Sequence, residues 1–315
     1  MEELLNGYFL QVLVFICINT ILALTIYMTL CTGLLSLGNA GFMSFGAYTS
    51  AILTMKLDLP MPLGILCGGI VAAVVALIIG LPTIRLRGLY LAIATLGFGE
   101  VVRVIALNLK ITNGALGLSG IPSMASVLSD YASDMGLIDA LSLDSQTAGQ
   151  LLMCIVLLVL VFVIFLFWYS LEHSRVGRAF AAIKADEHAA ALSGINVNYY
   201  KMMAFLFSSF FAGVAGAIYA HATFFISPTD FTWHKVVDML LYTVFGGSNV
   251  MWGPLLGATV LTIVPESLRA MSEYRDIIYG LMLVVLMAFR PDGILSYDAV
   301  KYISRAFKKA PKGGN

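Results

Sequence analysis

The chain has 315 residues, of which 60% are hydrophobic and only 11% are charged, and its mean hydropathy is +0.92. Its 18 basic and 18 acidic residues cancel, so net charge indicates neither an acidic nor a basic partner. This composition excludes an ordinary soluble domain. Because apolar runs near 20 residues recur, and a bilayer admits only helices or closed barrels, we expect an all-α, polytopic bundle of about eight to ten transmembrane helices.

The first four apolar runs are predicted membrane spans. Tyr8–Leu30 is almost uniformly apolar, and we expect it to be a retained span because no basic residue precedes it, as a signal peptide would require. Leu34–Met55 is interrupted by Gly, Ser and Asn, so one side of that helix must face protein or water. Met61–Leu81 is a third span, broken by Pro82, and Gly88–Asn108 is a fourth.

Residues 111–150 are predicted to form an external loop. The segment lacks Lys and Arg, and short cytoplasmic loops are enriched in both. Its acidic residues are Asp130, Asp134, Asp139 and Asp144. The next span, Leu151–Trp168, then runs inward and Tyr200–Ala222 runs outward. Residues 172–199 between them therefore form a predicted cytoplasmic loop.

The remaining apolar runs are shorter than a full crossing. They predict short, tilted, broken or partly re-entrant helices, which a bilayer tolerates only where protein or a water-filled cavity covers the free backbone groups. The three runs are Val236–Phe245, Trp252–Val264 and Ile277–Phe289. Residues 291–315 carry five Lys and Arg residues and are a predicted cytoplasmic tail. If the tail is cytoplasmic, nine spans place the N-terminus outside the membrane, and eight or ten spans place it in the cytoplasm.

The predicted cytoplasmic loop contains a helix-forming stretch rich in Ala, Arg, Lys and Glu that is expected to end at Gly194 in a left-handed cap. On one continuous helix, Phe180 and Ile183 share a face, and Glu187 and Ala190 extend it. Two interpretations remain open at this point. The helix either lies on the membrane surface or is a rigid handle that another protein grips.

Polar side chains inside the second predicted span are candidates for a translocation path. Ser36, Ala40, Ser44 and Tyr48 recur every four residues and form one stripe on a helix. A tight helix interface explains such a stripe as well as a pore lining does. Asn39 is more informative, because a buried amide needs partners from a path or from another helix.

The fourth predicted span contains two charged residues, Glu100 and Arg103, which can meet on one helix face. Leaving either alone at the bilayer centre costs about 2.5–3.5 kcal/mol on insertion scales, so mutual pairing is expected. A gate or substrate contact is the alternative. The candidate path residues are Ser36, Asn39, Ser44, Tyr48, Thr95 and Glu100.

Several kinds of site are not expected. The cysteines lack metal or redox spacing and are interpreted as packing residues; they are Cys17, Cys31, Cys67 and Cys154. The four histidines are scattered singly, so no metal site is predicted. The phosphate-binding pattern Gly-x-x-x-x-Gly-Lys-Ser/Thr is absent from the sequence, so this chain is expected to be neither an ATPase nor another enzyme and to bind no cofactor.

Five stretches together resemble the permeases of ABC importers, and especially those of the branched-chain amino-acid class. They are Leu34–Tyr48, Leu86–Arg103, Gly177–Ile195, Gly246–Gly257 and Ile278–Leu295. The third resembles the cytoplasmic coupling motif that docks on the ATPase. It departs from the best-known permeases, because its Gly lies seven positions after its Glu rather than six.

The resemblance implies a permease subunit of an ATP-driven importer of leucine, isoleucine and valine in a bacterial cytoplasmic membrane. It implies a second homologous permease, two ABC ATPase subunits that bind the ATP, and an external solute-binding protein that meets residues 113–122. Membrane lipid and an amino-acid substrate are further expected partners, and nucleic acid is not. The implied ATPase-coupling residues are Gly177, Arg178, Ala179, Ile183, Glu187, Ala190 and Gly194.

A transporter of amino acids or amides that is driven by an ion gradient is the alternative function. Broken helices near the bilayer midplane fit that class as well. A membrane-embedded enzyme has little support, because no convergent group of His, Cys or carboxylate residues lies within the predicted spans.

Overall fold

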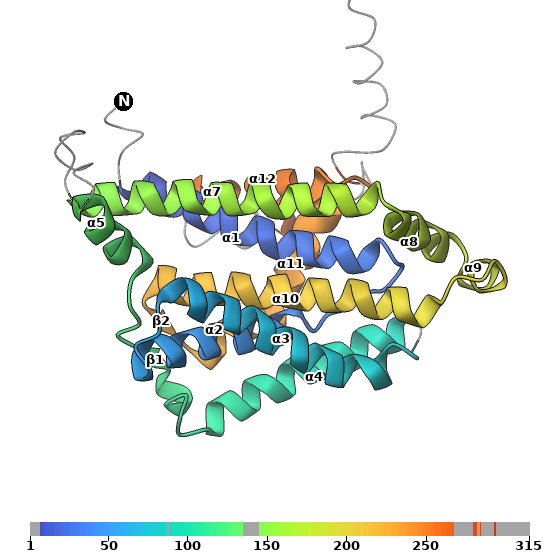
Figure 1. Ribbon diagram of the computed structural model, residues 1–315, viewed down its shortest axis with the longest axis horizontal. Coiled ribbons are helices and arrows are strands. Elements are labelled where there is room, and N and C mark those ends of the chain that lie inside the picture. Colours follow the sequence, from blue (N-terminus) through green and yellow to red (C-terminus); the bar gives the residue numbers. More distant parts are fainter. Residues whose placement is uncertain are drawn as a thin grey trace, which may run out of the picture.

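The computed structural model describes residues 7–86, 88–134 and 145–267, with positions 280, 281, 284 and 293. Its long helices run side by side in a bundle (Figure 1). Five helices of the described part are long and apolar enough to cross a membrane. They are α1 (Gly7–Leu30), α3 (Met61–Thr83), α4 (Leu89–Asn108), α7 (Ser145–Glu172) and α10 (Val197–Thr223). The predicted all-α polytopic membrane fold is confirmed.

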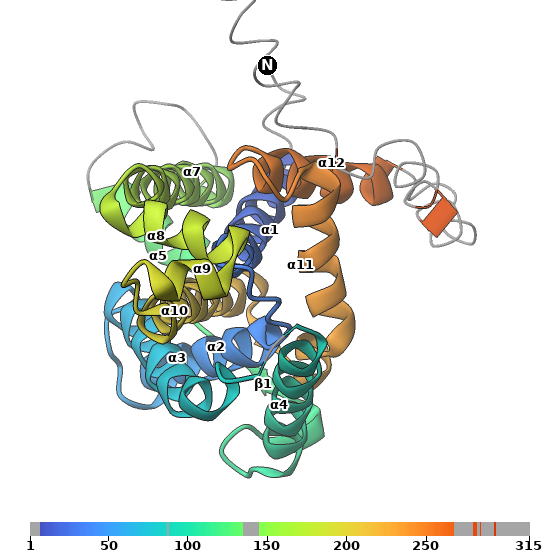
Figure 2. The same cartoon turned by 90° about the vertical axis from the view of Figure 1, so that its right-hand side faces the viewer.

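Three shorter helices complete the described bundle: α2 (Asn39–Lys56), α11 (Trp233–Gly246) and α12 (Gly253–Ser267). Figure 2 shows α11 running across the bundle, from beside α4 to α12, rather than along it. Helices α11 and α12 are therefore short where the sequence predicted short helices, whereas α2 is shorter than the span predicted over Leu34–Met55. The predicted span at 277–289 and the tail at 291–315 lie outside the described residues apart from single positions, so the count of eight to ten spans stays a prediction.

The two ends of the bundle differ in structure. At one end, named the α5 end, lie η1 (Gly114–Leu116), β1 (Leu118–Ser119), α5 (Met124–Asp134), β2 (Phe225–Ile226) and η2 (Pro228–Phe231). Strands β1 and β2 pair antiparallel. At the other end, named the α8 end, lie α8 (Arg175–Ala185) and α9 (Glu187–Leu192). The first residue of α1 lies at the α5 end, on the side opposite the α8 end (Figure 1).

Two predicted boundaries differ from the structure. Helix α7 begins at Ser145, so it extends into the predicted external loop of residues 111–150, and that loop also contains α5, which packs on α7. Pro82 does not break the third span, because α3 continues to Thr83. Its missing amide removes one hydrogen bond to the preceding turn, yet α3 continues past it by one residue.

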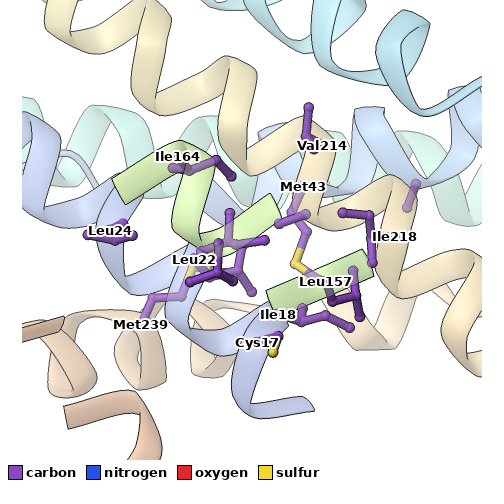
Figure 3. Packing of buried hydrophobic residues seen from close by; sticks show 14 of the residues in the cluster. Cys17, Ile18, Leu22, Leu24, Met43, Leu157, Ile164, Val214, Ile218 and Met239 are labelled. Carbon is purple, nitrogen blue, oxygen red and sulfur yellow. The ribbon is translucent and has the colours of Figure 1, made fainter. Parts of the chain in front are cut away.

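Helix α1 is the centre of the hydrophobic core. It is apolar around its whole circumference, and such a helix is stable only when neighbours cover every side. Helices α7, α10, α11 and α12 contact it. Figure 3 shows Ile18 and Leu22 of α1 packed near Leu157 of α7, Met43 of α2 and Ile218 of α10. In contrast, α3 and α7 expose many apolar side chains, as expected for helices that face acyl chains.

Helices α2, α3 and α10 make backbone contacts through glycines. A Cβ atom on Gly46 would lie 1.9 Å from the carbonyl oxygen of Gly213, and one on Gly216 would lie 2.0 Å from that of Met43. A Cβ atom on Gly68 would lie 2.7 Å from the Gly46 carbonyl oxygen. Small residues of this kind allow membrane helices to pack at short distance. The glycines therefore determine how closely the three helices approach.

Candidate functional site

Helix α2 begins at Asn39, not at Leu34 as predicted, and the residues before it are non-helical. Ser36 therefore does not belong to the helical stripe. Non-helical backbone inside a membrane must be buried in protein or line a cavity, and its polar groups need partners. The Leu37 amide donates to the Thr95 hydroxyl at 2.9 Å, and the Gly38 amide contacts the Ser36 hydroxyl at 3.5 Å. Tertiary partners thus replace the helical bonds.

Thr95 joins this segment to α4. Its hydroxyl accepts the bond from Leu37 and donates its own proton to the Leu91 carbonyl oxygen at 2.9 Å. Gly38 permits the close approach, because a Cβ atom there would lie 3.2 Å from the carbonyl oxygen of Thr95. Two of the predicted path residues, Ser36 and Thr95, are therefore brought together, and both are buried.

Asn39 is 1% exposed and links three helices. Its Nδ2 donates to Thr25 Oγ1 of α1 at 2.7 Å and to Ser208 Oγ of α10 at 3.2 Å. Both hydroxyls donate their protons elsewhere, to the carbonyl oxygens of Leu22 and Thr25, so they act as acceptors towards the amide. The Oδ1 atom has no hydrogen-bond partner among the described residues. The sequence predicted that a buried Asn39 has hydrogen-bond partners but not which ones; the structure shows that they are Thr25 and Ser208.

The other predicted path residues occupy different surroundings. Ser44 is buried, and Tyr48 lies against Phe231 with ring centroids 5.9 Å apart. The predicted pair on α4 is present: Arg103 Nε donates to Glu100 Oε1 at 2.8 Å, and both side chains are partly exposed. None of the six path residues lines the groove between α7 and α10 or the pocket between α7 and α8. All of them except Glu100 are buried.

Lys235 is a charged residue inside the bundle that the sequence analysis missed, because the predicted apolar run began one residue later. Its Nζ donates to Asn19 Oδ1 at 3.2 Å, and Asn19 Nδ2 donates to Thr262 Oγ1 at 3.1 Å. This chain of hydrogen bonds connects α11, α1 and α12. Ionisable residues at this depth are unusual enough to mark a candidate functional position.

The predicted single cytoplasmic helix is two helices, α8 and α9, because the backbone at Asp186 is extended. The Asp186 carboxylate caps α9 by accepting from the amides of His188 at 2.8 Å and Ala189 at 3.0 Å. The bonds from Ala189 and His188 lower the pKa of the Asp186 carboxyl. Aspartate is among the preferred N-caps, so the break has a local sequence cause.

The two short helices are fixed to the bundle by specific contacts. Phe180 stacks on Trp168 of α7 with centroids 6.1 Å apart. Glu187 Oε2 of α9 accepts from Lys201 Nζ of α10 at 2.7 Å. Lys184 Nζ donates to Asn249 Oδ1, after α11, at 3.1 Å. Because these contacts reach α7, α10 and the α11–α12 connection, a displacement of α8 or α9 acts on all three.

The seven predicted coupling residues divide between two faces. Those buried against the bundle are Gly177, Ala179, Ile183 and Ala190. Arg178 and Gly194 are exposed, and Glu187 is partly exposed. Gly194 has φ +83°, so it terminates the segment in the left-handed conformation, as predicted.

Leu192 was missed as a candidate contact, although it is 91% exposed at the tip of α9. Its signal was available in the sequence, as a large apolar residue close to the terminating glycine. His188, on the same short helix, and Arg178, on α8, are also exposed at this end of the bundle.

The described residues contain no group of three or more His, Cys, Asp or Glu side chains that could hold a metal ion. The arrangement combines a buried polar cluster around Asn39 with a pair of helices that is fixed to the bundle at the α8 end.

Comparison with known proteins identifies the family. Residues 8–287 match the model for the branched-chain amino acid transport system / permease component family. The chain is 35% identical over 272 residues to the high-affinity branched-chain amino acid transport system permease protein LivM of Escherichia coli K12, an alignment that covers 84% of this chain and 64% of LivM. It therefore spans slightly less than two thirds of that relative. No solved structure matches.

Two shorter matches extend the comparison. The ribose import permease protein RbsC of Escherichia coli K12 is 31% identical over 127 residues, covering 38% of this chain and 39% of RbsC. The permease protein LivH of the same strain is 28% identical over 137 residues, covering 42% of this chain and 44% of LivH. With the extensive family match and its multiple apolar helices, the chain is a bacterial multi-pass inner-membrane protein and belongs to the branched-chain amino acid transport permease family.

Proposed function

We propose that this chain is the membrane-spanning permease subunit of an ATP-driven ABC importer for leucine, isoleucine and valine. It works with two separate ATPase subunits, a second homologous permease and an external solute-binding protein. ATP is bound by the ATPase subunits, and this chain contributes no ATPase site. The α8 end faces the cytoplasm, and the α5 end faces the binding protein.

The attachment of α8 and α9 to the bundle is the observation that carries the proposal. A partner ATPase needs a handle that moves as one body with the spans. Here the Phe180–Trp168 stack and the Glu187–Lys201 ion pair connect the handle to α7 and α10. The exposed face, with Arg178 and Leu192, is left free for docking within the described structure.

The transport cycle follows from these connections. ATP binding draws the two ATPases together and displaces α8 and α9. Helix α10 moves with them and carries Ser208, which bonds to Asn39 at the start of α2. This bond makes the start of α2 move with α10, so the contacts of α2 and of the segment before it with α4, such as Leu37–Thr95, are the first to change, and the path beside α2 and α4 opens to one side. The direction is set by the different affinities of the two states for nucleotide and for the loaded binding protein.

Two observations support an amino-acid cargo over a sugar. The match to LivM is 35% identical over 84% of this chain, whereas the fructose import permease FrcC of Rhizobium meliloti is 25% identical over 75% of it and the ribose permease matches only 38% of it. The five resembling stretches are also those of the branched-chain class. The similarity to LivH supports assembly with a second permease, because both relatives are named as permeases of branched-chain amino-acid systems.

Reconstitution in vesicles tests the proposal. The complete importer should accumulate labelled leucine only with ATP and the binding protein, and ribose should not replace leucine. Gly194→Pro should abolish ATP-dependent uptake, because proline cannot adopt φ +83°. Leu192→Glu should weaken ATPase binding, whereas Leu57→Glu, at an exposed leucine that directly follows α2, should not.

The same vesicles distinguish the alternative function. A secondary transporter needs no motor, so the purified chain alone should then accumulate leucine in a proton or sodium gradient. Uptake of that kind, or normal uptake by Gly194→Pro at normal expression, would refute the importer proposal.

A further inference from the structure

A small polar pocket lies at the α8 end, where α8 joins the bundle. Its lining comes from the ends of α1 and α7, from α8 and from the α11–α12 connection. The pocket has a volume of about 180 Å³, or about 540 Å³ when the open space at its mouth is included. A helix of about 10–12 Å diameter would fill the larger volume with about one turn, so the space suits a small molecule.

One wall of the pocket is aromatic. Trp168 of α7 contacts Tyr27 of α1 and Phe180 of α8, with ring centroids 6.2 Å and 6.1 Å apart. All three side chains are at most 2% exposed. The Trp168 indole N–H has no hydrogen-bond partner among the described residues, although buried indoles usually find one. The lining therefore offers a fixed apolar surface and a donor that the described chain does not use.

Two side chains of opposite charge line the same pocket. Glu172 is the last residue of α7, and Lys184 lies in the last turn of α8. They are not joined by an ion pair in the part of the chain that the structure describes. Lys184 Nζ donates to Asn249 Oδ1 at 3.1 Å, which uses one of its three protons. Both charged residues are exposed, so a ligand that enters at the α8 end can reach them.

Backbone contacts fix the two helix ends that carry these charges. A Cβ atom on Gly177 would lie 2.0 Å from the carbonyl oxygen of Glu172, so α7 and α8 meet through main chain at this turn. A Cβ atom on Gly33 would lie 3.7 Å from the α-carbon of Lys184, so α8 also touches the segment after α1. A ligand that bridges Glu172 and Lys184 therefore links two helices that are already in register.

The combination of charges selects a zwitterion. A carboxylate repels a free anion, and an ammonium group repels a free cation. Two other basic residues close in sequence lie outside the lining: His173, whose imidazole is bonded to the Tyr169 carbonyl oxygen at 2.9 Å, and Arg175. The described residues include no cluster that could hold a metal ion here. A free aliphatic amino acid carries both charges and an apolar side chain, so it matches both the charged groups and the aromatic wall.

We propose that this pocket is a second, cytoplasmic site for an aliphatic amino acid, at which the imported product slows further uptake. The ammonium group of the ligand pairs with Glu172 and its carboxylate with Lys184, while its side chain lies on the aromatic wall. The ligand joins α7 to α8 and opposes the displacement of α8 that ATP binding causes. This regulation rests on the proposed function, whereas the binding itself does not require transport.

Binding of labelled leucine to the purified full-length chain tests the site. Glu172→Gln and Lys184→Gln should each weaken binding about tenfold or more, because each removes one charged partner of the ligand. Arg175→Gln, at an exposed basic residue of α8 outside the lining, should leave it unchanged. Binding should also change the tryptophan fluorescence, since Trp168 is part of the wall.

Ligand analogues test the charge pairing. Leucinamide lacks the carboxylate and isocaproate lacks the ammonium group, so each should compete about tenfold or more weakly than leucine with wild type. Lys184→Gln should remove the preference for leucine over leucinamide, and Glu172→Gln the preference over isocaproate. Ala181→Leu, which fills the pocket, should abolish binding, whereas Ala185→Leu, at another exposed alanine of α8 outside the lining, should not.

Vesicles that contain the complete importer test the regulation. Leucine on the side of the ATPase subunits should slow ATP-dependent uptake in wild type. The ratio of uptake with and without this leucine should return to one in Glu172→Gln. Because each variant is compared with itself, a change in its basal rate does not affect the result.

Several outcomes would overturn the proposal: a wild-type chain that binds none of leucine, isoleucine and valine, charge variants that bind as tightly as wild type, or analogues that compete as well as leucine. Loss of binding when the ATPase subunits are added would assign the pocket to them. Binding without slower uptake would refute the regulatory role. An absence of ATP-dependent leucine uptake would instead refute the proposed function, because binding to the purified chain is measured without transport.

Discussion

The ion pair between Lys201 and Glu187 predicts a measurable loss of stability when one partner is removed. The two side chains are 7% and 32% exposed, and the charged atoms are 2.7 Å apart. Breaking a fully buried pair costs about 3–5 kcal/mol, whereas an exposed pair contributes about 0.2–1 kcal/mol. Because Glu187 keeps contact with solvent, we expect Lys201→Met to lower the free energy of unfolding by about 1–2 kcal/mol.

A double-mutant cycle separates this pair from its surroundings. Lys201→Met, Glu187→Gln and the double variant are compared with wild type by thermal unfolding in detergent, with Lys110→Met as an exposed lysine control. A coupling energy of about 1 kcal/mol is expected between the two positions. It corresponds to a difference of about 2–4 °C in the unfolding midpoint for a large domain.

The same variants should also consume more ATP per leucine transported, because the pair connects α9 to α10. If the losses of unfolding free energy in the two single variants add up to the loss in the double variant within about 0.3 kcal/mol, the pair contributes nothing specific and the reasoning is refuted.

Three further predictions concern other contacts. His221→Phe removes bonds from the imidazole to α2 and to the Pro122 carbonyl oxygen, both 2.9 Å long, and should lower stability by about 1–3 kcal/mol and expose the 111–122 segment to protease; unchanged proteolysis would contradict it. Gly46→Ala places a Cβ atom against the Gly213 backbone and should lower the free energy of unfolding by about 1–3 kcal/mol. A thermal unfolding midpoint equal to that of wild type would contradict this prediction. Asp186→Ala should speed hydrogen exchange in the first turn of α9 at neutral pH. In wild type the ionised Asp186 cap stabilises α9 at pH values above the unfolded pKa of about 3.8, and this stabilisation is lost as the pH falls through the lowered pKa of the folded state. Exchange in α9 that responds neither to the substitution nor to protonation of Asp186 would contradict the prediction.

The sequence predicted the long spans well because the bilayer imposes a simple physical requirement. Some 20 apolar residues are needed to cross it, and α1, α4 and α10 begin and end within three residues of the predicted runs. The Glu100–Arg103 pair was also predictable, because spacing along one helix determines it.

The start of α2 could not be predicted in this way. The residues before Asn39 include no proline, and their non-helical backbone is satisfied by Thr95, which lies 58 residues from its partner Leu37. Only the folded chain brings the two together. The partners of Asn39 were hidden for a related reason, since Thr25 lies within a run that is otherwise almost uniformly apolar.

The sequence contains a signal for the break between α8 and α9, but the prediction followed helix propensity instead. Asp186 is a good N-cap, whereas the Ala-rich residues on both sides favour one continuous helix. The cap forms because the two helices bury different residues, Phe180 and Ile183 in one and Ala190 in the other. Tertiary packing therefore decides whether Asp186 caps a second helix or lies within one continuous helix.

The glycine contacts among α2, α3 and α10 have a mechanical consequence. Where main chain rests on main chain, as at Gly46 and Gly213, there are no side-chain rotamers that could rearrange to absorb a shift. These three helices are therefore stiff towards one another and move as one block. A push delivered to α10 through Lys201 reaches the start of α2 with little loss. The relative sliding that opens a path is confined to the borders of this block, where it makes fewer contacts with α4 and α11 than its three helices make with one another.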